Sequence, residues 1–361
     1  MTRSDFGRSA LDTAVALAIG GAGGTLFFVL HSPLPWTLGS LFATALVTGF
    51  GGRWFLPRFA WAFARPFVGV LAGSAFTLPV ILSMPGWWDS ILALVVYSGV
   101  ITVLGWLLFT RVCKYDDVTA FFASAPGGLG ELSLLGSTLG GKVRTIVLIH
   151  AVRIVVVVFT VPFLVQWLIW PTVLPSGGAA ANHASVGLEL SDWLVMTACG
   201  VAGYFIGRPF RSFGGVMLVP MALSAAVHIA GLTAVSPPYW LVAAVQVVIG
   251  AISGARFAGT TWNELRTTAF FAFVWAIVIL VTALFAAWLC TFFSDAPLVA
   301  LVLAFSPGGI VEVTVMAYAI GLHVAFIVTC QICRTTLVLL ITPALFRLAR
   351  ITGRLHGDEM D

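Results

Sequence analysis

The stretch SAPGGLGEL, Ser124 to Leu132, places a proline, a pair of glycines and a carboxylate inside an otherwise apolar segment. Proline and glycine are the poorest helix formers, so a helix that reaches this stretch is expected to break there. A second copy, FSPGGIVEV, runs from Phe305 to Val313. Its Pro307 lies 181 positions after Pro126. The chain therefore repeats one helix-breaking motif.

The same offset relates residues well outside the motif. It pairs Gly127 with Gly308, Gly128 with Gly309, Glu131 with Glu312, Arg153 with Arg334, and, upstream, Gly69 with Gly250 and Gly73 with Gly254. One ungapped spacing over roughly ninety-five residues indicates an internal duplication. We predict a first repeat over 1–170, a linker rich in Pro, Gly and Ser over 171–190, and a second repeat over 191–361.

Composition identifies the class of protein. Of the 361 residues, 60% are hydrophobic and 9% are charged, and the mean hydropathy is +1.06, which is far outside the range of soluble domains. Apolar stretches long enough for helical spans recur along the chain, so we predict an all-α polytopic membrane protein. The net charge of +4 fits basic cytoplasmic loops, and no basic cluster is dense enough to follow nucleic-acid phosphates.

Hydrophobic segments predict five full crossings in each repeat, and the two short pieces around each PGG form a re-entrant hairpin. A piece of about ten residues rises about 15 Å as a helix, half of a roughly 30 Å bilayer core. With two hairpins, all Lys and Arg residues outside the spans fall on one side, which the positive-inside rule makes cytoplasmic. The repeats are then inverted and both termini are cytoplasmic. The expected spans are 11–30, 36–51, 64–83, 90–110, 145–169, 191–207, 213–231, 238–255, 267–290 and 323–346.

Among the 18 Lys and Arg residues, only Arg153 and Arg334 lie deep inside predicted spans, about ten residues from the nearest end, where an ionisable group is a functional hypothesis by default. Each has a polar companion three residues earlier on the same helical face, His150 or Gln331. We predict that the arginines and the exposed backbone of the breaks bind a small anion. The predicted binding residues are Ser124, Gly127, Gly128, Glu131, His150, Arg153, Ser306, Gly308, Gly309, Glu312, Gln331 and Arg334, with Pro126 and Pro307 as the helix-breaking residues.

A purely structural alternative stays open for these residues. Glu131 and Glu312 complement the positive N-terminal ends of short helices, and they are also suited to neutralise Arg153 and Arg334. In that case the charges lock the hairpins against the spans and bind nothing.

Enzymatic and metal sites find no support in the residues. The sequence has no HExxH, GxSxG or phosphate-binding GxxxxGK[ST] motif, so we expect no enzyme activity and no cofactor. Cys330 and Cys333 form a CxxC inside an apolar segment, but no second Cys or His pair stands at metal-ligand spacing, so no metal site is predicted.

The duplicated PGG-x-x-E motif, followed about twenty residues later by an intramembrane arginine, resembles the AbrB family of bacterial membrane proteins. That resemblance covers about Leu11 to Leu348 and implies a bacterial inner membrane protein with a transport or regulatory role. Members are often labelled ammonia monooxygenases, but the His and carboxylate cluster of a copper site is missing.

These observations favour a secondary transporter of a small organic anion, with a carboxylate as the expected substrate. Transport by alternating access would be coupled to H⁺ or Na⁺. A membrane-embedded regulator or scaffold, a membrane oxygenase and a passive channel for a neutral solute stay as alternatives. Glycine-rich helix faces further suggest a homodimer.

Overall fold

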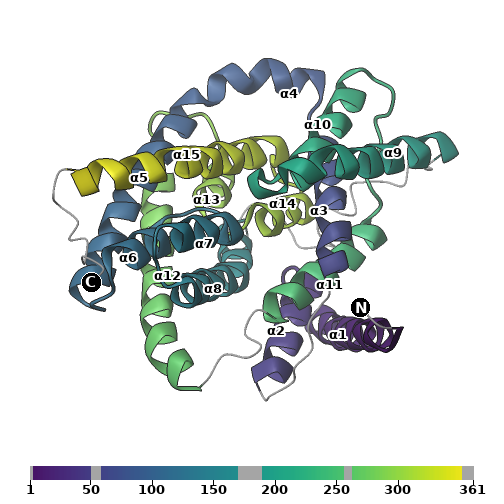
Figure 1. Cartoon of the computed structure of the whole chain (residues 1–361). Coiled ribbons are helices and arrows are strands. Elements are labelled where there is room, and N and C mark those ends of the chain that lie inside the picture. The colour runs from purple at the N-terminus through teal and green to yellow at the C-terminus, as the bar shows by residue number, and fades with distance from the viewer. Residues whose placement is uncertain (1–2, 50–57, 170–188, 256–261, 352–361) are drawn as a thin grey trace. The chain divides into compact units, whose positions relative to one another are not determined.

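The computed structural model describes residues 3–49, 58–169, 189–255 and 262–351, and within these ranges it contains helices and no strands (Figure 1). The expected linker over 171–190 lies outside the described residues as far as residue 188. The helices are α1 (Arg3–Val29), α2 (Pro35–Gly49), α3 (Arg58–Gly73), α4 (Leu78–Ser83), η1 (Met84–Trp87), α5 (Trp88–Arg111), α6 (Asp117–Ser124), α7 (Leu129–Thr138), α8 (Val143–Ile169), α9 (Leu190–Gly207), η3 (Arg208–Phe213), α10 (Gly215–Ile229), α11 (Tyr239–Ala255), α12 (Trp262–Cys290), α13 (Leu298–Phe305), α14 (Ile310–Ile320) and α15 (Val324–Ile351).

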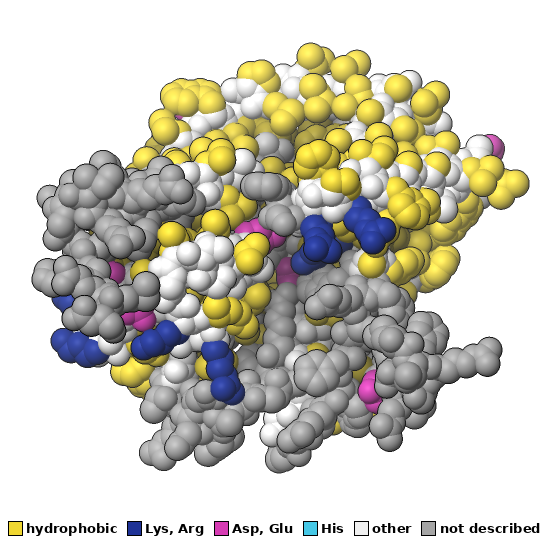
Figure 2. Space-filling view, viewed as in Figure 1, with side chains coloured by type: hydrophobic (Ala, Val, Ile, Leu, Met, Phe, Trp, Pro, Cys, Tyr) yellow, Lys and Arg dark blue, Asp and Glu magenta, His cyan; other side chains and the backbone are white. Residues whose placement is uncertain are grey.

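The lengths and surfaces of these helices fit a membrane. Six segments are long and apolar enough to cross one: Asp12–Val29, Leu78–Arg111, Val143–Leu168, Leu190–Arg211, Thr268–Cys290 and Val324–Ile341. Hydrophobic side chains cover much of the face drawn in Figure 2, and large ones such as Leu82 and Trp167 are more than 70% exposed. Apolar surface on this scale is not left in water by a soluble protein. The fold is therefore that of a multi-pass helical membrane protein.

One predicted span is wrong as a single helix. The segment expected over 64–83 ends as α3 at Gly73, and α4 starts only at Leu78. Thr77 is the extended N-cap residue of α4, and Pro79 occupies its first turn. Proline lacks an N–H and fixes its own φ, so it starts a helix more readily than it continues one.

The helix boundaries repeat as the sequence does. The helices α6, α7 and α8 start at 117, 129 and 143, and α13, α14 and α15 start at 298, 310 and 324. Each later start lies 181 positions after its counterpart. The duplicated sequence thus produces the same succession of two short helices and one long helix.

The chain folds into two compact units that do not coincide with the predicted repeats, because each unit takes helices from both halves of the sequence. Unit 1 consists of residues 1–85, 158–261 and 311–328, and unit 2 of residues 86–157, 262–310 and 329–361. The units therefore describe how the helices pack, and the repeats stay a prediction from the sequence.

In unit 1, helices from the first half of the sequence pack on helices from the second half. Helix α3 packs on α10, and its counterpart α11 packs on α2. Both crossings are close: a β-carbon at Gly73 would lie 2.6 Å from Cβ of Ser224, and one at Gly250 would lie 2.9 Å from Cβ of Ser40. Glycine at these positions lets the backbones approach. The two crossings are therefore versions of one contact.

Unit 2 is also built from helices of both halves of the sequence, and its centre is the contact between α5 and α12. Helix α6 packs on α5, and α13 packs on α12. The aromatic rings of Phe109 and Trp275 meet edge to face between these elements, with their centroids 5.7 Å apart. Unit 2 thereby holds the breaks that follow α6 and α13 on a packed helical frame.

Candidate functional site

The helix breaks are real and short. Helices α6 and α7 have 8 and 10 residues, and α13 and α14 have 8 and 11. At 1.5 Å per residue, each piece spans about 12–17 Å, well short of a bilayer core. Between α6 and α7, Ala125 and Gly128 adopt extended backbone conformations. The proline and glycines thus interrupt the helix as the sequence predicts.

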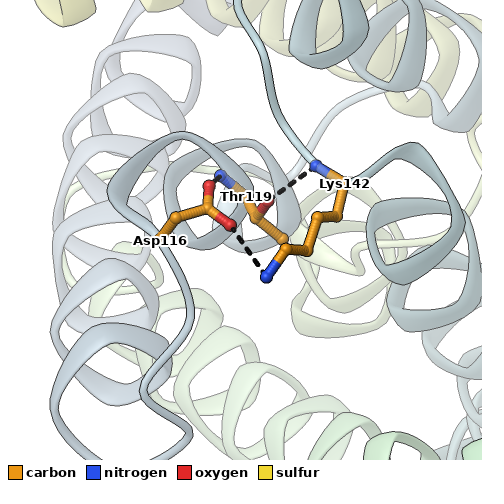
Figure 3. Close-up of polar contacts among 3 residues, drawn as sticks. All are labelled: Asp116, Thr119 and Lys142. Atoms are coloured by element: carbon orange, nitrogen blue, oxygen red, sulfur yellow. Dashed lines mark hydrogen bonds and ion pairs between the residues drawn. The ribbon is translucent and has the colours of Figure 1, made fainter. Parts of the chain in front are cut away.

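The start of α6 contacts the segment that follows α7, as Figure 3 shows for Asp116, Thr119 and Lys142. Asp116 caps α6 by accepting from the backbone N–H of Thr119 at 2.7 Å. The Thr119 hydroxyl oxygen accepts from the backbone N–H of Lys142 at 2.8 Å, and the Lys142 Nζ lies 3.8 Å from the Asp116 carboxylate. Lys142 follows α7, so the segment from 117 to 142 leaves and returns at one place.

Arg153 holds the first break. Its side chain is 1% exposed. Its Nη1 donates to the carbonyl oxygen of Ala125 at 3.0 Å, and its Nη2 donates to that of Gly127 at 2.9 Å. A cation is favourable at the C-terminal end of α6, where carbonyls lack helical partners. Arg153 therefore satisfies backbone groups that the break leaves exposed.

Arg334 repeats this arrangement at the second break. Its side chain is 2% exposed. The Nη1 donates to Ser306 O at 2.9 Å and the Nη2 donates to Gly308 O at 3.5 Å, and these acceptors lie 181 positions after those of Arg153. In the part of the chain that the structure describes, the hydrogen-bond acceptors of both guanidinium groups are carbonyl and amide oxygens. A carboxylate is not among these acceptors.

His150 and Gln331 occupy equivalent positions with different chemistry. His150 Nε2 lies 3.0 Å from Phe122 O, and Gln331 Nε2 donates to Leu303 O at 3.0 Å. The Gln331 side-chain oxygen accepts from Arg334. Both side chains are fully buried. Each companion thus joins its long helix to the last turn of the short helix before the break.

The arrangement leaves hydrogen-bonding atoms unused. Among the described residues, the buried atoms without a partner include Arg153 Nε, Arg334 Nε, His150 Nδ1, Ser306 Oγ and Trp275 Nε1. All belong to unit 2. Buried polar atoms in folded proteins are nearly always paired with protein, water or ligand. These five atoms are hydrogen-bonding capacity that the described residues of unit 2 leave unused, while Trp36 Nε1 and Ser253 Oγ are buried without a partner in unit 1.

The two guanidinium groups also act on each other. Arg153 and Arg334 lie within electrostatic range of one another and of the Tyr97 hydroxyl. Tyr97 donates to Ile279 O at 3.0 Å, and its ring packs on Phe305 with the centroids 5.6 Å apart. Two like charges in a low-dielectric interior repel each other, and a negative charge placed near both offsets the energy of that repulsion.

The carboxylates lie at the starts of the second short helices. Glu131 is in the first turn of α7. Its carboxylate lies against the N-cap residue Gly128, so closely that a β-carbon on Gly128 would collide with it. Glu312 is in the first turn of α14 and is 5% exposed. A carboxylate favours the positive N-terminal end of a helix. Glu312 belongs to unit 1.

The remaining predicted residues line the breaks. The Ser124 hydroxyl donates to Phe121 O at 2.8 Å, so it is engaged locally, whereas Ser306 Oγ has no partner within the described ranges. Gly127 is buried, and a β-carbon on it would lie 2.7 Å from Leu132 Cδ1. Gly308 is buried and Gly309 is half-buried directly before α14. Pro126 and Pro307 lie within the non-helical segments.

Sequence reasoning missed Tyr97 and Trp275. Both stand well inside predicted spans, whereas interfacial aromatic residues gather at span ends. A buried tyrosine or tryptophan carries a polar atom that needs a partner. Their position within the span was the signal available in the sequence.

The fold and the site define a multi-pass helical membrane protein with two broken-helix segments, each bound by a buried arginine. The chain belongs to the AbrB family: residues 36–350 match the family model described as "Transition state regulatory protein AbrB". It is 25% identical to "Uncharacterized protein YhjN" of Bacillus subtilis over 365 residues, which cover 96% of this chain and 94% of that protein. It is also 25% identical to "Putative regulator AbrB" of Escherichia coli over 335 residues, which cover 89% of this chain and 91% of that protein.

Proposed function

We propose that the chain is a secondary transporter of a small organic anion, with a carboxylate as the substrate and H⁺ or Na⁺ as the coupling ion. It works in a bacterial inner membrane by alternating access. Two inverted repeats supply five crossings and one re-entrant hairpin each, and both termini are cytoplasmic. The substrate binds at the two breaks.

The observation that carries this proposal is the pair of buried guanidinium groups in unit 2. Their Nη atoms are committed to carbonyl oxygens, while the Nε of each has no partner in the described part of the chain. Partial charges at two helix C-termini, about half an elementary charge each, offset only part of two full positive charges. A carboxylate supplies the missing negative charge and accepts N–H donors in the plane of a guanidinium group.

The local geometry supports a hairpin. Helices α6 and α7 are too short to cross the membrane, and the outer ends of the pair meet at Thr119 and Lys142. Backbone that is not helical at membrane depth is tolerated where it is buried in protein or lines a polar cavity. Broken helices at the substrate site are a recurring feature of transporters with inverted repeats.

The test uses the full chain in proteoliposomes. Radiolabelled lactate, succinate, citrate and glutamate are offered to the wild type, to Arg153→Gln and Arg334→Gln, and to Arg208→Gln as a surface-arginine control. We expect saturable uptake of at least one acid by the wild type and the control. We expect loss of that uptake in both site variants, with size-exclusion profiles unchanged.

A membrane-embedded regulator or scaffold is the second candidate. The family description and the name of the Escherichia coli relative both refer to regulation, and the arginines hold backbone carbonyls whether or not a substrate binds. Under this alternative none of the four acids is taken up by the wild type. Arg153→Gln and Arg334→Gln then misfold without any transport phenotype to lose.

A further inference from the structure

The buried histidine beside Arg153 identifies the coupling ion, provided that the transport function proposed above is correct. We infer that the imidazole of His150 binds the co-transported proton, so that the chain is a proton–anion symporter. A proton taken from water on one side forms the imidazolium, and the same proton returns to water on the other side.

The hydrogen bond of His150 fixes which nitrogen is available. Phe122 O lies 3.0 Å from His150 Nε2, and a carbonyl oxygen only accepts, so Nε2 carries a hydrogen. In the neutral ring Nδ1 is then a bare acceptor. This atom is fully buried and has no donor among the described residues. This nitrogen is the atom to which a proton can add, and because burial disfavours the imidazolium, the addition requires a negative charge nearby.

The second repeat lacks this capacity. Gln331, the equivalent of His150, donates to Leu303 O and accepts from Arg334. An amide does not titrate, and Gln331 has its oxygen and its nitrogen engaged. One proton site for two breaks therefore predicts one proton for each transport cycle.

Electrostatics couples the proton to the anion. Arg153 follows His150 by three residues on α8, and its charge acts on the imidazole. Arg334 on α15 and Tyr97 on α5 act on Arg153 in turn. On α6, the group that faces the imidazole is the backbone carbonyl of Phe122. The acidic residues Asp116 and Asp117 lie at the opposite end of that helix. A second positive charge at His150 is disfavoured while the site is empty and favoured when an anion neutralises Arg153. Proton and anion thus strengthen each other's binding, as linkage requires.

The residues around the two breaks are less suited to bind Na⁺ than to bind a proton. Na⁺ needs several oxygen ligands, and the carbonyl oxygens of Ala125, Gly127 and Ser306 already accept from guanidinium groups.

The experiment compares the wild type with His150→Gln, which installs the residue of the second repeat, and with His323→Gln as a control outside the site. Proteoliposomes receive radiolabelled lactate, succinate, citrate and glutamate under a proton gradient or a sodium gradient. We expect accumulation by the wild type and His323→Gln to follow the proton gradient. Their apparent Kd should rise about tenfold per unit of pH once His150 loses its proton. In His150→Gln, proton-driven accumulation is lost and the Kd no longer varies with pH.

A second measurement does not depend on the variant folding. The potassium salt of the transported acid, adjusted to the pH of the sample, is added to the wild type in weakly buffered detergent solution, and binding should draw one proton from the solution for each anion bound. Wild-type accumulation driven by sodium alone, binding without proton uptake, or an unchanged pH profile in folded His150→Gln would each overturn this inference and leave transport standing. If the wild type transports none of the four acids under either gradient, the transport function fails and this inference fails with it.

Discussion

Each arginine at a break makes two kinds of contribution. Its Nη atoms bind carbonyls that the broken helix leaves behind, and its Nε remains without a partner in the described residues. Sequence reasoning placed the two cations correctly inside spans, because charge in an apolar run is conspicuous. It could not assign their acceptors, since spacing along the chain does not say whether a carbonyl or a carboxylate lies opposite.

Stability measurements separate these contributions at the first break. Arg153→Gln leaves at least one of the Ala125 and Gly127 carbonyls buried without a donor, at about 1–3 kcal/mol for each unsatisfied group. Arg153→Lys keeps the charge and can reach a carbonyl, so it should lose less. Thermal unfolding in detergent should rank the wild type above Arg153→Lys and Arg153→Gln lowest. Equal melting temperatures for the two variants would contradict the assigned hydrogen bonds.

The ion pair between Asp116 and Lys142 gives a second prediction for single residues. Asp116→Ala removes the N-cap of α6 and should cost about 1 kcal/mol of unfolding free energy. Lys142→Gln breaks an ion pair whose side chains are 71% and 37% exposed, so it should cost less than Asp116→Ala. Unfolding curves in low and high salt test this order. A larger loss for Lys142→Gln would show that the ion pair, and not the cap, secures the start of α6.

For the helices, the sequence was informative about boundaries and poor on partners. Nine of the ten expected spans correspond to single helices, and the PGG motifs break where the proline and glycines stand. The break between α3 and α4 was missed because apolar residues continue on both sides of it, and the sequence does not say that Pro79 starts a new helix while Pro66 lies within one. The pairing of α2 with α11 and of α3 with α10 could not be predicted, since a glycine-rich face indicates close packing without naming its partner.

The glycine crossings of unit 1 lead to a matched pair of predictions. A β-carbon at Gly250 would lie 3.0 Å from the backbone nitrogen of Leu41, and one at Gly69 would lie 3.2 Å from that of Met221. Backbone cannot yield as a side-chain tip does, so Gly250→Ala and Gly69→Ala should each cost about 1–3 kcal/mol. Gly99→Ala in α5, where a β-carbon meets nothing within 4 Å, should be neutral or slightly stabilising. Melting temperatures compare the three. A tolerated Gly250→Ala would mean that α2 and α11 are further apart than described.

At the scale of the whole molecule, the proposed topology can be tested by chemical labelling. In a background without the native cysteines, Asp116→Cys and Lys142→Cys should react with a membrane-impermeant maleimide from the same side, because the segment between them returns to its starting point. Labelling from opposite sides would turn residues 117–142 into a full crossing. That result would remove the inverted repeats from the proposal.

The packing between the two halves of the sequence in unit 1 also sets an order of events during biosynthesis. Helix α3 lies on α10, and α2 lies on α11. The chain separation is 154 residues for the contact of Val70 with Ser224 and 207 residues for that of Ser40 with Val247. At roughly 5–20 residues per second, the ribosome takes on the order of 8–40 s to synthesise these intervals. During this wait the glycine-lined faces of α2 and α3 meet lipid or an insertase. The helices of the N-terminal half therefore wait without these final partners until the C-terminal half has been made.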